Sequence, residues 1–570
     1  MIKQAALASA LAVSAVIHPL PAQDDGRGFD LIPANAMLVH WCQGPKALTD
    51  AFVDTRLAEL LTGPELTAVL TPMLEMARQE AGQDDGPGAA ALALEEALAD
   101  YEGHLVAAAG LTTGQIDPSA FMYGQWDSVG MWAVCALSAD GHTDLAQLQQ
   151  RLSEIIESTA DAEIVDLEVE GRTFQASANE GEVNVTMPFM EGDDLVIVFG
   201  SQVDEALATF LSRDGQSLAD QPLTMPASAI GVWMNLRSIW PMVDAMAAGE
   251  DPMLPEFLGA IGLRSLDTAM MSVSPSGEHV ILDFDVRMND EPQGLFSCIT
   301  EIDPSPPALL DIAPVHRETW SVTKLNIGAL FDSLMDAVWT MEPTTGMAPE
   351  FLLDQFETQF RVRLKEDMID HLGDELLMVT ADEPEDLFDE DAVQAQCIGI
   401  ALRDSKSFAE SFETMLRSRG LHAARKTEDY RGFTVRRLSV LGMLELSYAI
   451  TDRAFLLGIN QEGAAALRTV LDEEQARDEG VARPSFSDEV ADRMEHAGGA
   501  WQSLSVSTWS ATIEMLAAAL EQSGEVPATF SDQLDSVMAM AMGLLQRYRV
   551  DTMVNIVRVG PRRVLTRTIW

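Results

Sequence analysis

Hydrophobic and polar positions follow two distinct periods along the chain. A period near 3.6 marks amphipathic helices, and residues 143–158 show it, with Leu and Ile side chains from Leu145 to Ile156 on one face. A period of two marks half-buried strands, and Val183, Val185 and Met187 alternate with polar residues in this way. Because both periods recur, the chain is expected to combine helices and strands.

The strand-like runs form consecutive groups, with helical stretches between the groups. We expect strands near 36–42, 104–109, 129–138, 163–169, 172–177, 182–188, 194–199, 229–236, 267–273, 279–287, 318–325, 375–380, 396–403, 433–439, 444–450, 454–459, 500–507, 551–559 and 563–569. We expect helices near 46–61, 64–80, 143–158, 202–212, 238–248, 254–262, 327–340, 350–370, 406–418, 462–472, 508–522 and 529–547. This order predicts an α+β fold with largely antiparallel sheets.

Short stretches of the second half match stretches of the first half in the same order. Ala206–Leu211 matches Ala466–Leu471 with four of six residues identical. The other matches are Ala47–Asp50 with Ala329–Asp332, Gly171–Phe174 with Gly432–Val435, and Leu266–Thr268 with Val550–Thr552. We interpret them as an internal duplication that gives two tandem related copies, each with a largely antiparallel sheet and packed helices. The expected division is a first α+β copy at 30–287, a Pro-rich linker at 288–316 and a second α+β copy at 317–570.

The first 22 residues have the pattern of a secretory signal peptide. Lys3 precedes an apolar run from Ala5 to Ile17, and the small residue Ala22 precedes a polar stretch. The run is shorter than the about 20 residues of a membrane-spanning helix. We expect cleavage after Ala22, with an uncleaved anchor as the alternative. The sequence therefore predicts an exported protein, periplasmic or extracellular, with no transmembrane segment in the mature chain.

Charge narrows the classes of partner. The 570 residues include 90 Asp and Glu against 36 Lys and Arg, a formal net charge of −54. Phosphate backbones require clustered cations, so the balance argues against a nucleic-acid partner, and it also argues against adsorption on anionic lipid. We interpret the large negative net charge as a feature that keeps an exported protein soluble.

Familiar catalytic motifs are missing from the sequence. It contains no G-x-S-x-G, H-E-x-x-H, P-loop, G-x-G-x-x-G or C-x-x-C pattern, and no two His residues lie three or four positions apart. We therefore assign no catalytic residue, no cofactor and no metal ligand. Cys42 and Cys135 pair as a disulfide or remain buried thiols, and the sequence leaves the pairing of Cys298 and Cys397 open as well.

Three local patterns have a functional and a structural interpretation, and the structural one is favoured for each. His40 and Cys42 share a strand face, as in a Cys–His nucleophile, or simply end a packed strand. Seven acidic residues between Asp382 and Asp391 bind calcium loosely or form a solvated loop. The Met residues of 538–542 form a copper site, line an apolar ligand cavity, or fill a helix core.

The C-terminal strands reverse the overall charge. Residues 547–570 hold six Arg against one acid, Asp551. Arg558, Arg562, Arg563 and Arg567 form a possible patch for an anionic partner such as a polysaccharide or envelope polymer. The alternative is that they pair with acidic neighbours across the sheet.

Several packing patterns carry a family resemblance. They are the opening Ile32–Met37, the Gly-Arg-Thr-Phe and Gly-Phe-Thr-Val strands, and the Leu-Val-Ile-Val-Phe-Gly-Ser junction at 195–201. With the signal peptide and the two-copy layout, the chain resembles uncharacterised exported bacterial proteins of domain-of-unknown-function family 3352. The resemblance implies no activity and no functional residues.

The leading functional prediction is an exported, non-enzymatic protein that acts by binding or as an envelope or extracellular component. It would have an envelope polymer or a protein as partner. The alternatives are an exported hydrolase whose site is assembled from distant residues, and a carrier of an apolar ligand.

Overall fold

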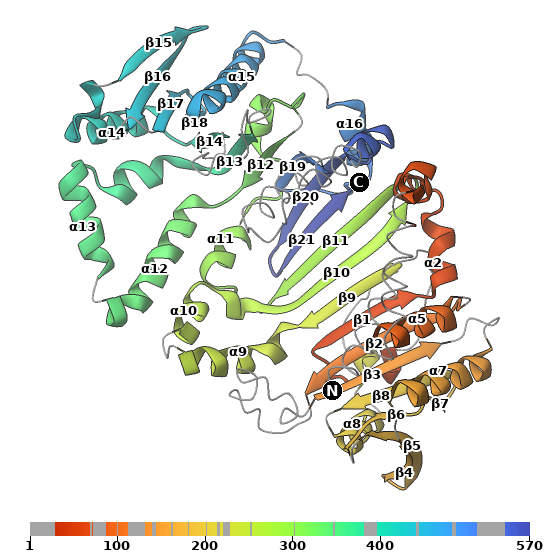
Figure 1. Cartoon of the computed structure of the whole chain (residues 1–570). Helices are drawn as coiled ribbons and strands as arrows, with labels where there is room; N and C mark the ends of the chain where they lie inside the picture. The colour runs from red at the N-terminus through yellow and green to blue at the C-terminus, as the bar shows by residue number, and fades with distance from the viewer. Residues whose placement is uncertain are drawn as a thin grey trace, which may run out of the picture. The chain divides into compact units, whose positions relative to one another are not determined.

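The computed structural model divides the chain into two compact units (Figure 1). One contains residues 1–252 and 267–284, and the other contains 253–266 and 285–570. The structure describes residues 29–68, 71, 87–99, 101–111, 131–138, 144–160, 163–179, 182–200, 202–213, 217–220, 228–250, 254–300, 302–317, 319–345, 348–380, 396–423, 425–440, 444–481, 486–509 and 542–570. Residues 1–22, the acidic stretch 382–391 and Met538–Met540 lie outside these ranges, as do most of 64–80 and 508–541.

The first unit is built on one antiparallel sheet. Neighbouring strands lie in the order β10–β9–β1–β2–β3–β8–β6–β5–β4, and β7 also pairs with β8. The strands are β1 (Leu38–Gln43), β2 (His104–Leu111), β3 (Met131–Ser138), β4 (Glu163–Val169), β5 (Arg172–Asn179), β6 (Glu182–Thr186), β7 (Phe189–Glu191), β8 (Asp194–Gly200), β9 (Ile230–Asn235) and β10 (Leu266–Ser276). The next strand, β11 (His279–Met288), contributes to both units.

Helices pack against this sheet, whose central strands β3 and β8 are buried along almost their whole length. They are α2 (Pro45–Phe52), α3 (Arg56–Thr62), α5 (Pro87–Leu98), α7 (Leu145–Ala160), α8 (Val203–Leu211) and α9 (Leu236–Glu250), with the 3-10 turns η1 (Phe29–Leu31) and η3 (Leu218–Asp220). The main core gathers Trp132 and Trp233 from the sheet with Phe210 of α8 and Leu31 of η1. Close packing of such large side chains fixes the position of α8 on the sheet.

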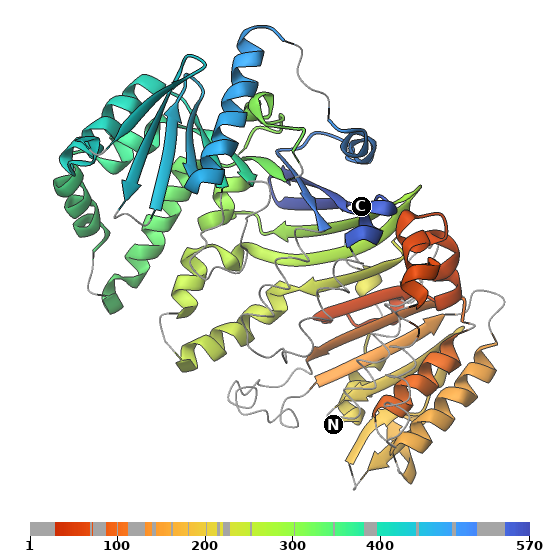
Figure 2. The same ribbon diagram turned by 45° about the horizontal axis from the view of Figure 1, so that its top comes forward.

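The second unit also has one antiparallel sheet (Figure 2). Its strands lie in the order β21–β20–β19–β12–β13–β14–β18–β17–β16–β15. They are β12 (Trp320–Lys324), β13 (Leu372–Thr380), β14 (Gln396–Leu402), β15 (Lys426–Tyr430), β16 (Phe433–Val440), β17 (Leu444–Ile450), β18 (Ala454–Ile459), β19 (Ser503–Thr508), β20 (Thr552–Gly560) and β21 (Arg563–Ile569).

Helices and turns also surround the second sheet. They are α10 (Leu254–Ala260), η4 (Leu263–Ser265), η5 (Gly294–Phe296), α11 (Ser297–Thr300), η6 (Ala308–Ile312), α12 (Ile327–Thr345), α13 (Pro349–Phe360), η7 (Leu364–Met368, a π turn), η8 (Ile369–His371), α14 (Ser405–Ser418), η9 (Leu421–Ala423), α15 (Asn460–Asp478) and α16 (Asp488–Glu495). The predicted α+β class with antiparallel sheets is confirmed.

The segment 288–316, expected to be a linker, is packed against the second unit. It contains η5, α11 and η6, and the side chains of Leu309 and Ile312 are buried. An ion pair from Asp311 to Arg477, at 3.2 Å, connects this segment to α15, and His316 Nδ1 lies 3.4 Å from a carboxylate oxygen of Glu473. The segment therefore forms part of the second unit and supplies one wall of the site described below.

Corresponding strands occupy the same places in the two sheets. In each, the first strand along the chain lies between two other strands: β1 between β2 and β9, and β12 between β13 and β19. In each, the four-stranded group after the third strand continues the sheet outward, as β8–β6–β5–β4 and as β18–β17–β16–β15. The register places Val39 opposite Trp233 and Trp320 opposite Val506.

Among the described helices, none is long and apolar enough to span a membrane.

Candidate functional site

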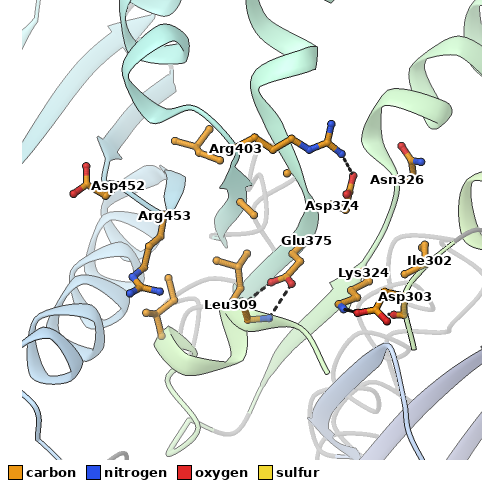
Figure 3. Close-up of a pocket in the computed structure, with 15 residues that line it drawn as sticks. Ile302, Asp303, Leu309, Lys324, Asn326, Asp374, Glu375, Arg403, Asp452 and Arg453 are labelled. Atoms are coloured by element: carbon orange, nitrogen blue, oxygen red, sulfur yellow. Dashed lines mark hydrogen bonds and ion pairs between the residues drawn. The ribbon is translucent and has the colours of Figure 1, made fainter. Parts of the chain in front are cut away.

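A pocket of about 650 Å³ lies in the second unit, where four neighbouring strands end (Figure 3). It is bounded by the end of β12, the start of β13, the end of β14 and the turn between β17 and β18, with η6 as one wall. The lining residues are Ile302, Asp303, Ala308, Leu309, Ile312, Lys324, Asn326, Gly373, Asp374, Glu375, Ala401, Leu402, Arg403, Asp452 and Arg453. This volume lies within the range of small-molecule sites, about 300–1,000 Å³.

Glu375 fixes the η6 wall. Its carboxylate accepts hydrogen bonds from the backbone N–H groups of Ala308, at 2.8 Å, and Leu309, at 2.7 Å. These are the first two residues of η6, so the carboxylate satisfies N–H groups that a helical turn leaves free and meets the positive end of the turn. Both oxygens of Glu375 are therefore occupied by structural bonds.

Lys324 is the most buried cation of the pocket. It lies directly opposite Glu375 in the β12–β13 register, and only 9% of its side chain is exposed. Its ammonium donates to Ser305 Oγ at 2.6 Å and lies 3.5 Å from a carboxylate oxygen of Asp303. The Ser305 hydroxyl and the Lys324 charge lower the pKa of Asp303, which favours its ionised form.

Arg403 and Arg453 bring two more positive charges to the pocket. Arg403 forms an ion pair with Asp374 at 2.6 Å, and about half of each side chain is exposed. Arg453 lies across the pocket from Lys324 and Asp303 (Figure 3). In the described parts of the chain, its guanidinium has no hydrogen-bond or ion-pair partner. The pocket therefore offers a guanidinium that no carboxylate of the described residues neutralises.

Helix α15 lies next to the turn that carries Arg453, on the side away from the pocket. The Thr451 hydroxyl accepts hydrogen bonds from the backbone N–H groups of Arg453 and Ala454. Glu474 of α15 lies near Thr451, its side chain is 2% exposed, and its Oε2 atom has no hydrogen-bond partner in the described structure. Burial, aided by the charges of Asp478 and Asp452, raises the pKa of Glu474 to about 7, against the Thr451 hydroxyl, which lowers it. Burial therefore favours the neutral form of the carboxyl behind the pocket.

The corresponding place in the first unit is filled by Tyr101. Gln43 pairs with His104 there as Lys324 pairs with Glu375, and the Gly44 N–H bonds to the Gly103 carbonyl as that of Leu325 bonds to Asp374. The buried Tyr101 hydroxyl lies 2.6 Å from the carbonyl oxygen of His104 and 2.8 Å from that of Ser138, and these two acceptors share its one proton.

Glycines make room for this tyrosine. A Cβ on Gly44 or Gly103 would lie within 3 Å of Tyr101 atoms. At the register positions of Gln43 and Gly103 the second unit carries Lys324 and Asp374. In the first unit this end of the sheet is therefore filled by Tyr101, whereas in the second unit the same end carries charged side chains.

The lining of the pocket is rich in charged side chains. Eight of its 15 residues are charged or carry an amide, and the lining includes no Ser, Thr, Cys, His or Tyr. Its candidates for nucleophilic catalysis are therefore Lys324 and the carboxylates. The carboxylates of Asp303, Asp374 and Glu375 are engaged by partners, whereas Asp452 is exposed. Arg453 is the lining cation that could bind an anion without breaking an ion pair among the described residues.

The four arginines of the predicted C-terminal patch do not line this pocket. Arg562 forms an ion pair with Asp290, and Arg563 bonds to Asp285 at 2.7 Å. Arg567 donates to the backbone carbonyl of His496, and the guanidinium of Arg558 lies beside Gly498. For Arg562 and Arg563, these contacts are the pairing with acidic neighbours that the sequence offered as the alternative.

The His40 and Cys42 side chains lie on one face of β1, as strand alternation predicts. Neither ring nitrogen of His40 has a hydrogen-bond partner within the described ranges, and burial lowers its pKa. Burial also raises the pKa of the Cys42 thiol far above its ordinary value, so a thiolate nucleophile is disfavoured. These observations agree with the structural interpretation of His40 and Cys42, in which the two residues are packed at the end of a strand.

All four cysteines are buried free thiols. Cys42 and Cys135 lie on β1 and β3 with β2 between them, a separation of about 10 Å for two strand spacings. A disulfide requires Cα atoms within about 7 Å. Burial raises the pKa of Cys135 and of Cys397 to about 12.

No group of three or more His, Cys, Asp or Glu side chains in the described residues is arranged to hold a metal ion. Comparisons with protein-family models, with curated proteins and with solved structures find no match. The site therefore has to be interpreted from its own geometry.

Sequence reasoning missed the pocket, because its lining comes from positions 302 to 453. One feature of the sequence pointed toward it. Asp452-Arg453 and Arg403-Asp404 are charged pairs placed directly at strand ends, where side chains of neighbouring antiparallel strands meet.

Proposed function

We propose that the chain is an exported, non-enzymatic binding protein whose second unit holds a small anionic ligand, carrying a carboxylate or a phosphate, in the pocket beside η6. The observation that carries this proposal is the unpaired guanidinium of Arg453, which lines the same pocket as the cations of Arg403 and Lys324. A guanidinium binds a carboxylate or phosphate through two parallel N–H donors.

The lining of the pocket holds four carboxylates against three cations, so an anion would be recognised locally, at Arg453, rather than by the net charge of the pocket. Glu375, Asp374 and Asp303 are each held by a donor group of the protein, so they repel an entering anion less than free carboxylates would, and Asp452 is exposed to solvent, which screens its charge. Arg403 is about half exposed and can turn from Asp374 toward a ligand. The hydrolase and carrier alternatives lack a comparable observation.

Replacing Arg453 by Gln should weaken binding of a small anion at least about tenfold, the effect of losing roughly 1.4 kcal/mol of binding free energy. Isothermal titration of the whole protein with succinate, citrate and inorganic phosphate measures the affinity. The matched control is Arg417→Gln, which removes an exposed arginine of the same unit outside the pocket and should leave the affinity unchanged. The proposal fails if none of the three anions binds below about 1 mM, or if Arg453→Gln binds as tightly as the parent.

Export rests on residues 1–22, and it predicts a mature chain that begins at Gln23. N-terminal sequencing of the protein recovered from the periplasm or medium of an expressing bacterium measures this directly. Recovery of an intact Met1 in the cytosol would contradict export.

We also propose that the two halves are copies of one ancestral fold, related to the family that the sequence resembles. The equal strand orders support it, as does Phe29–Pro33, which aligns with Leu310–Pro314 at the offset of 281 that the register of β1 and β12 requires. An experimental structure whose second half paired its strands in another order would overturn it.

A further inference from the structure

Helix α12 of the second unit (Figure 1) presents large apolar side chains to solvent. Leu334 and Trp339 are 47% and 41% exposed, whereas the small side chains of Ser333 and Ala337 are buried. A helix on the surface of a protein normally turns its large apolar side chains toward the core and its polar ones toward water. The orientation of α12 is therefore inverted.

Contacts with η5 and α11 account for the small residues on the inner side of α12. The Ser333 hydroxyl donates to the Gly294 carbonyl at 3.0 Å and lies 3.6 Å from the buried Cys298 sulfur. Ala337, one turn later, is almost completely buried. Small side chains let a helix pack closely against its neighbours. This packing explains Ser333 and Ala337, but it does not require large apolar side chains on the opposite side.

The outward side chains form one continuous stripe along α12. The apolar stripe consists of Phe331, Leu334, Met335, Val338 and Trp339, and each of these side chains is at least partly exposed. The first four have the i, i+3, i+4, i+7 spacing of a single helix face, and the fifth lies one turn after the third. Single exposed apolar residues are common, but a contiguous exposed patch marks an interaction site.

The helix that follows the first strand of the other sheet has the ordinary orientation. In α2, Leu48 and Phe52 are buried, whereas Lys46 and Asp50 are exposed. That helix has 8 residues, whereas α12 has 19. The same place in the fold is therefore occupied without an exposed apolar stripe in the first unit, so the stripe is not a requirement of the fold.

The surroundings of the apolar stripe are acidic. Residues 327–360, which include α12 and α13, contain six Asp and Glu and no Lys, Arg or His. Asp336 of α12 and Glu350 and Asp354 of α13 are exposed, and their carboxylates have no ion-pair or hydrogen-bond partner among the described side chains. A partner that places cations beside apolar side chains would complement both features.

We propose that the apolar stripe binds an amphipathic, basic helix of a partner protein. Such a helix carries its apolar side chains at the same spacing as the stripe, so the two faces can pack ridge into groove. Lys and Arg at its edges would lie near the unpaired carboxylates. A second copy of this chain fits less well, because it would bring acidic borders together on chains of net charge −54. Anionic lipid is repelled in the same way.

The test measures how tightly the whole protein binds a synthetic helix, two repeats of Leu-Lys-Lys-Leu-Leu-Lys-Leu, by isothermal titration in physiological salt. We expect the double variant Leu334→Ala, Trp339→Ala to bind at least about tenfold more weakly, because large buried side chains contribute most to such interfaces. Alanine preserves the helix. The matched control, Leu61→Ala, Val481→Ala, removes two exposed apolar side chains outside the stripe and should bind like the parent. Both variants keep the net charge of the parent, so general attraction of a basic peptide is equal in all three proteins.

Each outcome decides the proposal. Weaker binding in Leu334→Ala, Trp339→Ala alone, with the melting temperature retained, supports it. Equal binding by this variant and the parent would mean that net charge alone holds the peptide and would overturn the proposal, as would no binding by the parent. A dimer of the parent that this variant abolishes would assign the stripe to a second copy instead, and tighter binding of phosphatidylcholine vesicles than of the peptide would assign it to lipid. Arg453→Gln should bind the peptide like the parent, so the result is independent of the small-anion pocket.

Discussion

Replacing Arg563 by Met should lower the free energy of unfolding of the second unit by about 2 kcal/mol, the size of a hydrogen bond to a charged group, because only the Asp285 partner is buried and the Arg563 side chain is itself 53% exposed. Asp285, its partner at 2.7 Å, is only 2% exposed, and one of its oxygens has no hydrogen bond within the described structure. Without Arg563, its remaining cation is Arg287, 3.5 Å away. The variant therefore leaves a buried carboxylate poorly compensated.

The double variant Asp285→Asn, Arg563→Met should recover most of this loss, because it removes the buried charge together with its partner. The control is Arg562→Met. Arg562 and Asp290 are 60% and 79% exposed, and exposed pairs contribute about 0–1 kcal/mol. Urea denaturation of the four proteins measures the differences. Equal losses in Arg562→Met and Arg563→Met would refute the role given to burial.

The contacts of Arg562 and Arg563 show how much of the arginine-rich C-terminus could be predicted from the sequence. The sequence shows the excess of Arg but not which acids lie opposite. Asp285 and Asp290 are more than 270 residues away from their arginines, and no local pattern connects them.

Strands with apolar alternation were predicted closely. The bounds of β4, β17, β18 and β21 agree with the predicted ranges residue for residue. The strand β15 was missed, because Lys-Thr-Glu-Asp-Tyr has no apolar alternation. It forms because the Arg431-Gly432 turn, with positive φ at both residues, returns the chain onto β16.

Helix ends were harder to predict than helix faces. The apolar periodicity of 46–61 continues through a break, and the structure divides it into α2 and α3, with the Thr55 hydroxyl accepting the Ala58 N–H at the new start. The predicted helix 350–370 ends at Phe360, because Arg361 adopts a left-handed φ of 59°. Periodicity reports burial of a face, whereas ends depend on single backbone angles.

The candidate site depended on contacts that sequence patterns do not carry. Glu375 reads as an ordinary polar residue of a strand, and its role appears only when η6, some 66 residues earlier, is placed against its carboxylate. Because residues 288–316 were expected to form a linker, the sequence analysis did not predict η6. Glu474 likewise occupies one position of an amphipathic helix, and only the packed β17–β18 turn shows that it is buried.

Replacing Glu474 by Gln should stabilise the second unit at pH 8 by about 3 kcal/mol and change little at pH 5. Burial raises the pKa of this carboxyl from 4.5 to about 7, and each unit of pKa corresponds to about 1.36 kcal/mol. Below about pH 4.5 the group is protonated in both the folded and the unfolded chain, so it has no pH-dependent effect.

Between pH 4.5 and 7 only the unfolded chain ionises, so the free energy of unfolding of the parent falls as pH rises. Above pH 7 the folded chain ionises too, and the full cost of a buried charge remains. A glutamine occupies the same place without that charge. Urea denaturation of the parent and the variant at pH 5, 6, 7 and 8 measures the widening gap.

The matched control is Glu479→Gln, because Glu479 follows the end of the same helix and is exposed. Its effect should be small and nearly independent of pH. If the gap between Glu474→Gln and the parent stayed constant from pH 5 to 8, the carboxyl would have the same pKa in the folded and unfolded chain. A buried, protonated Glu474 behind the pocket would then be excluded. A gap that widens with pH would instead mean that the Thr451 turn, and with it Arg453, is supported by a neutral carboxyl in acidic solution and by a buried charge in alkaline solution.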